Sequence, residues 1–146
     1  MRRQRNSEKG SALIEFSVAL VTILIVLYGI IDIGRALYAY NWVSNAARQG
    51  TRFAEVRGAF CNKLPTACPA SGQDVNNYVK SLAIGVDPQL LDVSTVCLVG
   101  HNFPAPPPCA PHGWVRVTVQ YRFNFVSPLV PLAWNMQSGS QVIVQN

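Results

Sequence analysis

Charged residues are scarce in this chain. Only 13% of its 146 residues are Asp, Glu, Lys or Arg, against the roughly one quarter that is typical of soluble domains. The net charge is +5, but four of the twelve basic residues, Arg2, Arg3, Arg5 and Lys9, lie within the first ten positions. The remainder has no compact basic patch, so a nucleic-acid partner is not expected. The shortage of charge instead predicts a segment that lies in lipid or in the core of a partner.

Catalytic motifs are also missing. The sequence has no HExxH, no nucleophile elbow, no phosphate-binding glycine loop and no paired carboxylates. Beyond residue 33 the only acids are Glu55, Asp74, Asp87 and Asp92, and each is isolated in the sequence. We therefore expect no enzyme activity, no catalytic residue and no cofactor.

One long apolar run lies near the N-terminus. Residues 11–33 read SALIEFSVALVTILIVLYGIIDI, and no residue between Phe16 and Ile31 is charged. This length is sufficient to cross a bilayer as a helix, in which every backbone group is paired. The preceding basic residues predict a cytoplasmic N-terminus and a C-terminus on the other side. The alternative is a cleaved secretory signal, but Leu37 occupies the minus-three position of the site at Ala39 and fits such a site poorly.

The helical pattern continues past the span, through residues 34–58. We expect this segment to project outward, so that a helix from residue 11 to residue 57 would be about 70 Å long. Arg52 and Glu55 are three apart and are expected to pair on the surface, and Gly58 is a suitable C-terminal stop. Residues at spacings of three, four and seven predict one packed face. They are Ala36, Tyr40, Val43, Ala47 and Ala54.

The junction between leader and span has a distinctive order of residues. The leader, residues 1–10, ends in Gly10; Ser11 begins the apolar run, and Glu15 and Phe16 follow. A carboxylate costs ~2.5–3.5 kcal/mol at the bilayer centre, so Glu15 is expected to have a partner. Cleavage after Gly10 would give Ser11 a free α-amino group, a natural partner for Glu15 of a neighbouring subunit. The alternative is that Glu15 lies near the cytoplasmic interface and reaches water.

The stretch GSALIEF, residues 10–16, resembles the processing site of type IV prepilins of the tight-adherence (Flp) branch, where Gly is followed by four residues, Glu and an aromatic. The continuation to residue 58 resembles the TadE-like family of pilus assembly proteins, in which an acid or amide and Gly-Arg close the span and Ala-Ala-Arg-x-Gly-x-Arg follows. The matching residues are Asp32, Gly34, Arg35, Ala46, Ala47, Arg48, Gly50 and Arg52. The resemblance is looser beyond residue 58, where it rests on residues 113–132.

This resemblance implies that a prepilin peptidase cuts between Gly10 and Ser11, and that Glu15 and Phe16 act in assembly. The mature subunit would join other pilin or pilus-assembly subunits through its N-terminal helix, from the inner membrane. Major pilins of this branch are little more than the helix, whereas this chain adds nearly ninety residues. That difference favours a minor pilin, or pseudopilin, over the bulk subunit.

An uncleaved, single-pass binding module is the alternative function. Its basis would be three aromatic residues, Trp42, Trp114 and Trp134, if they were exposed to a partner. The competing interpretation places them in the core or at an interface, because aromatics dominate small cores.

Residues 59–146 differ in composition and are expected to form a small α+β domain outside the cytoplasm. All the prolines and cysteines of the chain lie there. Residues 74–84 place Val75, Val79 and Leu82 on one helical face, and residues 114–125 alternate as a strand. We expect an antiparallel sheet of about three strands packed on the projecting helix. The other expected segments are strands at 92–99 and 141–145, a proline-rich loop at 103–111 and an apolar turn or short helix at 127–134.

Four cysteines outside the cytoplasm can form two disulfides, with three possible connectivities. We favour the nearest-neighbour pairing, Cys61–Cys68 and Cys97–Cys109. The alternative is a zinc site made of Cys97, His101, Cys109 and His112. The spacing of these four residues is not that of a recognised zinc finger, and prolines crowd the loop, so no metal site is expected.

Overall fold

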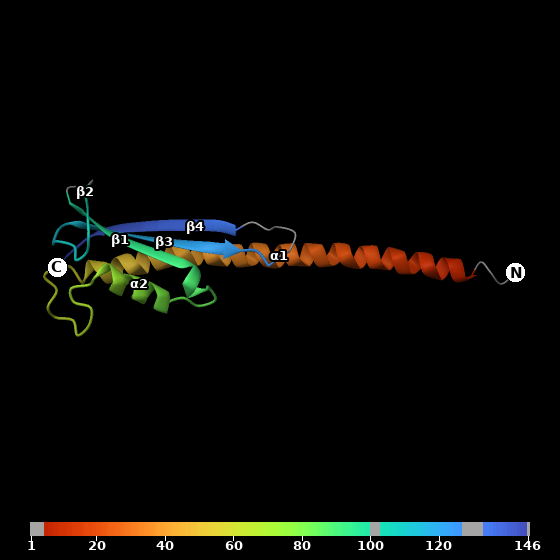
Figure 1. Ribbon diagram of the computed structural model, residues 1–146, viewed down its shortest axis with the longest axis horizontal. Helices are drawn as coiled ribbons and strands as arrows, with labels where there is room; N and C mark the ends of the chain where they lie inside the picture. Colours follow the sequence, from red (N-terminus) through yellow and green to blue (C-terminus); the bar gives the residue numbers. More distant parts are fainter. Residues whose placement is uncertain (1–4, 100–102, 127–132, 146) are drawn as a thin grey trace.

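A single 51-residue helix dominates the structure. In the computed structural model, which describes residues 5–99, 103–126 and 133–145, helix α1 (Arg5–Glu55) runs without a break. No proline occurs before Pro65, so nothing interrupts its hydrogen-bond ladder. The N-terminal part of α1 extends alone, and every other element lies beside its C-terminal half (Figure 1). The long predicted helix is therefore confirmed, although it ends at Glu55 rather than at residue 57.

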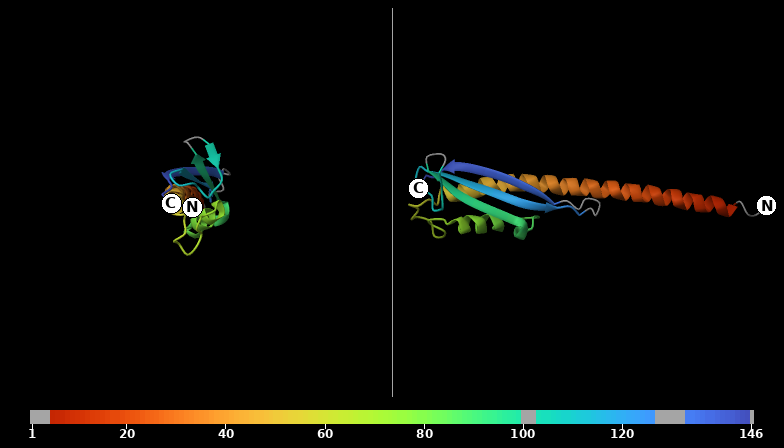
Figure 2. Two further views of the ribbon diagram at one scale, coloured as in Figure 1. Left: turned by 90° about the vertical axis from the view of Figure 1, so that its left-hand side faces the viewer. Right: turned by 45° about the horizontal axis from the view of Figure 1, so that its top comes forward.

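The rest of the chain forms a small sheet and one more helix. Helix α2 (Gly72–Ser81) and a 3-10 turn, η1 (Pro88–Leu90), precede the strands. The strands are β1 (Leu91–Val99), β2 (Phe103–Ala105), β3 (Trp114–Asn124) and β4 (Ala133–Ile143). All neighbours are antiparallel, in the order β2-β1-β3-β4. The expected α+β class is confirmed, and its three longer strands, β1, β3 and β4, run alongside α1 (Figure 2).

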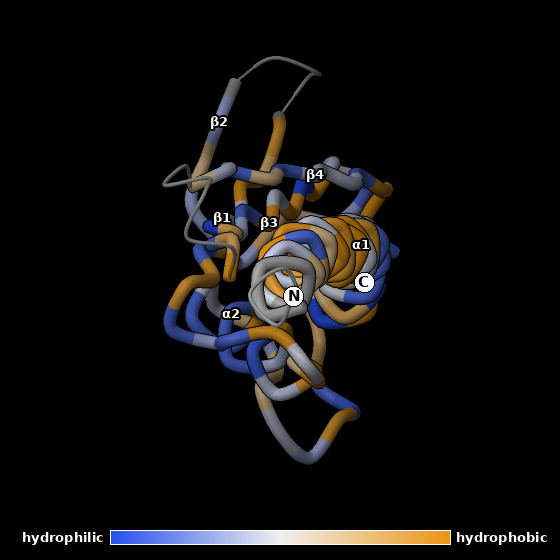
Figure 3. The backbone as a smooth tube through the Cα atoms, turned by 90° about the vertical axis from the view of Figure 1, so that its right-hand side faces the viewer, coloured by the Kyte–Doolittle hydropathy of each residue, from blue (hydrophilic) through white to orange (hydrophobic). Residues whose placement is uncertain are grey.

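Both helices cover the same face of the sheet. Helix α1 lies under β3 and β4, and α2 lies under β1 (Figure 3). The predicted alternation in β3 is confirmed, since Val115, Val117, Val119, Tyr121 and Phe123 are buried and the residues between them are largely exposed. They pack on small side chains of α1 and on two valines of α2. The helix residues are Ala39, Val43, Ala46, Ala47, Ala54, Val75 and Val79.

The prediction that Tyr40 belongs to the packed face of α1 was wrong. Tyr40 is 57% exposed, whereas Ala39, one position earlier, is buried. Successive helix residues are about 100° apart, so Tyr40 lies at the border of a face centred on Ala39 and Val43. The small side chains at this face let the helix backbone approach the sheet closely.

Two strand predictions were wrong. The segment expected to be only a proline-rich loop contributes β2, in which Pro104 is tolerated because β2 is an edge strand. Strand β4 begins at Ala133, not at residue 141, and Trp134 pairs with Phe123 instead of lying in a turn. The sequence of β4 does not alternate between apolar and polar residues, so it gave no signal for a strand. Met136 is the only residue of β4 that is buried. Residues 127–132 of the predicted turn lie outside the described residues.

Helix α2 begins earlier than the predicted start at Asp74. Its N-cap is Ser71, whose hydroxyl accepts a hydrogen bond from the Asp74 N–H. The Asp74 carboxylate accepts in return from the Ser71 backbone N–H at 2.8 Å. Hydrogen bonds from the Ser71 side chain and backbone lower the pKa of Asp74. This reciprocal cap stabilises the first turn of α2.

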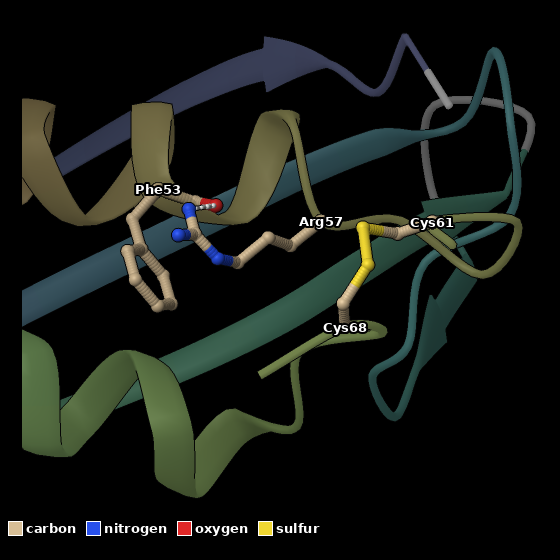
Figure 4. The surroundings of a disulfide bond; sticks show 4 residues. All are labelled: Phe53, Arg57, Cys61 and Cys68. Atoms are coloured by element: carbon tan, nitrogen blue, oxygen red, sulfur yellow. Dashed lines mark hydrogen bonds between the residues drawn. A yellow bond between two sulfur atoms is a disulfide. The ribbon is translucent and has the colours of Figure 1, made fainter. Parts of the chain in front are cut away.

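The cysteines form the two nearest-neighbour disulfides. Cys61–Cys68 closes the loop between α1 and α2, beside Arg57 and on the side away from Phe53 (Figure 4). Cys97–Cys109 joins β1 to the segment before β3. The sulfur atoms of Cys97 and Cys109 are therefore bonded to each other rather than free as zinc ligands. His101 lies outside the described residues.

Candidate functional site

The N-terminal half of α1 exposes an apolar surface. Its large apolar side chains from Leu13 to Ile33 are between 43 and 69% exposed, and an 18-residue stretch there is apolar enough to cross a membrane with none of it buried. The turns of this half are largely orange in the hydropathy view (Figure 3). The hydroxyls of Ser17 and Thr22 donate to backbone carbonyls one turn earlier, so neither is unpaired in lipid. These features are those of a single-pass membrane anchor.

The N-terminal end of this surface contains the predicted processing and assembly residues. Gly10, Ser11, Glu15 and Phe16 all lie on α1, and all are exposed. Ser11 and Glu15 are four residues apart and therefore share one helix face. No described residue of the same chain forms an ion pair or hydrogen bond with the Glu15 carboxylate. A partner for Glu15 would have to come from outside the described part of the chain.

The C-terminal end of the apolar run is joined to the sheet by one buried carboxylate. Asp32 is only 4% exposed, although it ends an apolar run. Its Oδ1 accepts a hydrogen bond from the Val126 N–H at 3.0 Å, 94 positions later in the chain, and lies 3.3 Å from Nη1 of Arg35. Asp32 thereby fixes the end of the β3 segment to α1 at the point where the span meets the outer domain.

Arg35 completes this junction. Its guanidinium lies 5.4 Å from the centre of the Phe123 ring, and Phe123 contacts Phe125 edge-on at 5.1 Å. The Arg35 guanidinium therefore lies over the aromatic pair at the end of β3. Gly34, between them, has open space around it, and nothing in the structure explains a glycine there.

The second predicted motif, Ala-Ala-Arg-x-Gly-x-Arg at residues 46–52, has small residues with a packing role. Ala46 and Ala47 are buried against the sheet and α2. A Cβ at Gly50 would lie 2.9 Å from Cγ2 of Val79 and 3.1 Å from Cγ1 of Val117. Glycine at this position therefore allows α1 to contact α2 and β3 at the same point. The small residues of this motif set the distance between the long helix and the outer domain.

The arginines of the same motif are on the surface. Arg48 donates to Oδ1 of Asn45 at 2.8 Å, while Arg52 is exposed. The predicted Arg52–Glu55 ion pair does not form. Beyond them Arg57 stacks on the Phe53 ring at 3.9 Å and donates to the Phe53 carbonyl (Figure 4). These arginines line a shallow basic depression of about 700 Å³ at the outer end of α1.

The comparison with protein families finds a similarity over most of α1. Residues 10–52 match the family model described as TadE-like protein. This part of the chain is therefore similar to TadE-like proteins. The match begins at Gly10 and ends at Arg52, so it covers the processing junction, the Asp32–Arg35 pair and the small-residue motif. Comparison with curated proteins and with solved structures gave no match.

The TadE-like match associates this chain with tight-adherence pilus assembly and with the components of that machinery. The family is one of structural and assembly proteins. The structure adds two contacts to the matched residues that the sequence did not reveal: the hydrogen bond from Val126 to Asp32, and the contact of Gly50 with Val79 and Val117. An acid at the end of an apolar run was the available signal for the first, but it could not indicate a partner 94 positions away.

Proposed function

We propose that this chain is a minor pilin, or assembly subunit, of a tight-adherence type IV-like pilus. In this proposal residues 1–10 are a cytoplasmic leader, which a prepilin peptidase removes between Gly10 and Ser11. Residues 11–33 span the inner membrane, residues 34–58 extend the helix outward, and residues 59–146 form the periplasmic or extracellular domain. The observation that carries the proposal is the TadE-like match, which begins at Gly10 and covers the exposed apolar part of α1.

Lateral helix association follows from the chemistry of that junction. Glu15 lies at the inner edge of an apolar surface and has no partner among the described residues. Cleavage after Gly10 creates a positive α-amino group one turn away from it on the same face. In a neighbouring subunit shifted along the helix axis, this amine would neutralise Glu15. A charge-assisted hydrogen bond of this kind contributes about 1.5–3 kcal/mol.

The shape of the outer domain favours a minor role. The sheet and α2 cover the outer half of α1 and leave its apolar half bare (Figure 1). The bare half can pack in a helical bundle, while the outer domain must lie outside that bundle. A domain of this width at every position would change the architecture of a filament whose main subunit is little more than a helix. A priming or tip position avoids that conflict.

The alternative function, an uncleaved binding module, has less support, because two of the three tryptophans are half-buried. Trp42 is half-buried and donates to the Leu82 carbonyl at 3.3 Å, and Trp114 is half-buried in β3. Only Trp134, at 60% exposure, remains available to a partner.

Substitution of Glu15 separates the two functions. We expect Glu15→Ala in the native host to reduce incorporation into sheared pili at least tenfold, because the loss of about 1.5 kcal/mol or more changes an equilibrium by that factor. Leader removal, measured by intact mass, should persist. Ser17→Ala is the matched control, since Ser17 bonds only to its own helix. Normal pilus incorporation of Glu15→Ala would contradict the proposed role of Glu15, whereas wild type that is absent from sheared pili and keeps residues 1–10 would support the uncleaved binding module.

A further inference from the structure

An apolar hollow lies at the end of the outer domain nearest the span. It has a volume of about 220 Å³ and is formed by α1, the end of the β3 segment and the start of β4. Its lining includes Ile33, Leu37, Tyr40, Phe125, Trp134 and Met136. Most of these side chains are open to the surroundings: Leu37 is 59% exposed and Trp134 is 60% exposed. Val126, which follows Phe125 in the sequence, is 57% exposed.

The depth of this surface follows from the helix. A hydrocarbon core about 30 Å thick is crossed by about 20 helical residues at 1.5 Å per residue. If the core begins after Glu15, at Phe16, it ends near Arg35. The Val126 N–H is bonded to Asp32, so the end of the β3 segment lies at the depth of the outer hydrocarbon boundary. The hollow, which spans positions 33–40 of α1, then lies within the headgroup layer.

A second exposed apolar residue lies at a similar height. The hydroxyl of Tyr38 donates to the Ile84 carbonyl at 2.6 Å, which fixes the loop after α2 to α1 three residues beyond Arg35. The Ile84 side chain is 76% exposed. Apolar and aromatic side chains thus come from both α1 and its neighbours at this height. Trp and Tyr are the residues that membrane interfaces favour, because their rings combine an apolar body with a polar group.

We propose that this end of the outer domain inserts into the interfacial layer of the bilayer that α1 spans. The occupant of the hollow is the phospholipid at the boundary of headgroups and acyl chains. Continuity with the span favours lipid, since the surface begins where the exposed apolar span ends. Arg35 and Arg122, the cations closest in sequence to this end, carry charges that suit lipid phosphates. The outer domain is then held against the membrane at a fixed orientation, with its basic depression farthest from the lipid. This inference requires only that α1 spans a membrane, and it is independent of leader cleavage and of the pilus role.

Tryptophan quenching by lipid tests the proposal. The full chain would be placed at one copy per nanodisc in phosphatidylcholine and phosphatidylglycerol, with acyl chains brominated near the headgroup. Wild type, W134F and W114F would be compared. Trp114 pairs with Ile143, nine positions along β4 from Trp134, which is about 30 Å at 3.3 Å per residue. Trp114 is therefore a matched control far from the lipid, and the span itself contains no tryptophan.

We expect several-fold more quenching in wild type and W114F than in W134F. Equal quenching of W134F and W114F, or no quenching of either, would overturn the proposal. Shielding of Trp134 from aqueous acrylamide only in discs that hold two copies, without quenching by brominated lipid, would also overturn it and would assign the hollow to a second copy of the chain. Trp134 is largely exposed and W134F changes one side chain, so folding of the variant can be checked by the emission of Trp42 and Trp114.

Discussion

Replacement of Gly50 by leucine is expected to destabilise the outer domain by about 3 kcal/mol or more, at the upper end of the usual cost of overpacking. A Cβ alone at this position would lie 2.9 Å from Val79 and 3.1 Å from Val117. Both valines are fully buried, and they belong to α2 and β3, so neither can move without shifting an element of the core. The three further carbons of leucine have no space between these elements. The long helix would have to separate from the domain that it supports.

Gly34→Leu is the matched control for this prediction. Gly34 lies in the same helix, and a Cβ there would meet nothing within 4 Å. Leucine is a better helix former than glycine, so we expect Gly34→Leu to change stability by less than about 1 kcal/mol. Urea titrations of the full chains in nanodiscs, followed by tryptophan fluorescence, measure both effects. Equal midpoints for Gly50→Leu and wild type would show that α1 does not pack on Val79 and Val117 as described.

Removal of the Asp32 carboxylate is expected to release the end of the β3 segment from α1. Asp32→Ala leaves the Val126 N–H and the Arg35 guanidinium without their shared acceptor. A hydrogen bond to a charged group contributes about 1.5–3 kcal/mol, so we expect a local loss of about 2 kcal/mol from the Val126 N–H bond. Asp32→Asn retains a side-chain oxygen for the Val126 N–H and should keep most of this stability.

Hydrogen exchange measures this local effect directly. A loss of about 2 kcal/mol should speed exchange of the Val126 amide roughly 30-fold in Asp32→Ala, at 1.4 kcal/mol for each factor of ten. Amides in the middle of β3, such as that of Val119, should change much less. Unchanged protection of Val126 in Asp32→Ala would mean that the hydrogen bond does not hold this end of the sheet.

The elements that sequence reasoning located are those with a strong local pattern. Helix α1 has no proline and a long apolar run, and β3 alternates valines and aromatics with polar residues, so each was predicted close to its observed bounds. Strand β4 could not be found in this way, because its residues have neither alternation nor strong strand preference and depend on eleven pairs with β3. The exposure of Tyr40 depends on where the sheet crosses α1, which the helix pattern alone does not determine.

The same distinction between local patterns and tertiary contacts applies to the candidate site. Asp32, Arg35 and Gly50 could be selected from the sequence by resemblance, but their contacts with Val126, Phe123 and Val79 depend on the tertiary arrangement. At the inner end, Glu15 and Phe16 remain predictions, because a partner subunit would complete their surroundings.

The N-terminal residue and the intact mass of the protein, purified from the membranes or pili of its native host, test the central claim most directly. The account predicts a chain that begins at Ser11, with the ten leader residues removed and both disulfides intact. A chain that still begins at Met1 or Arg2 would contradict prepilin-type processing. The protein would then be better described as an uncleaved membrane-anchored assembly factor or binding module.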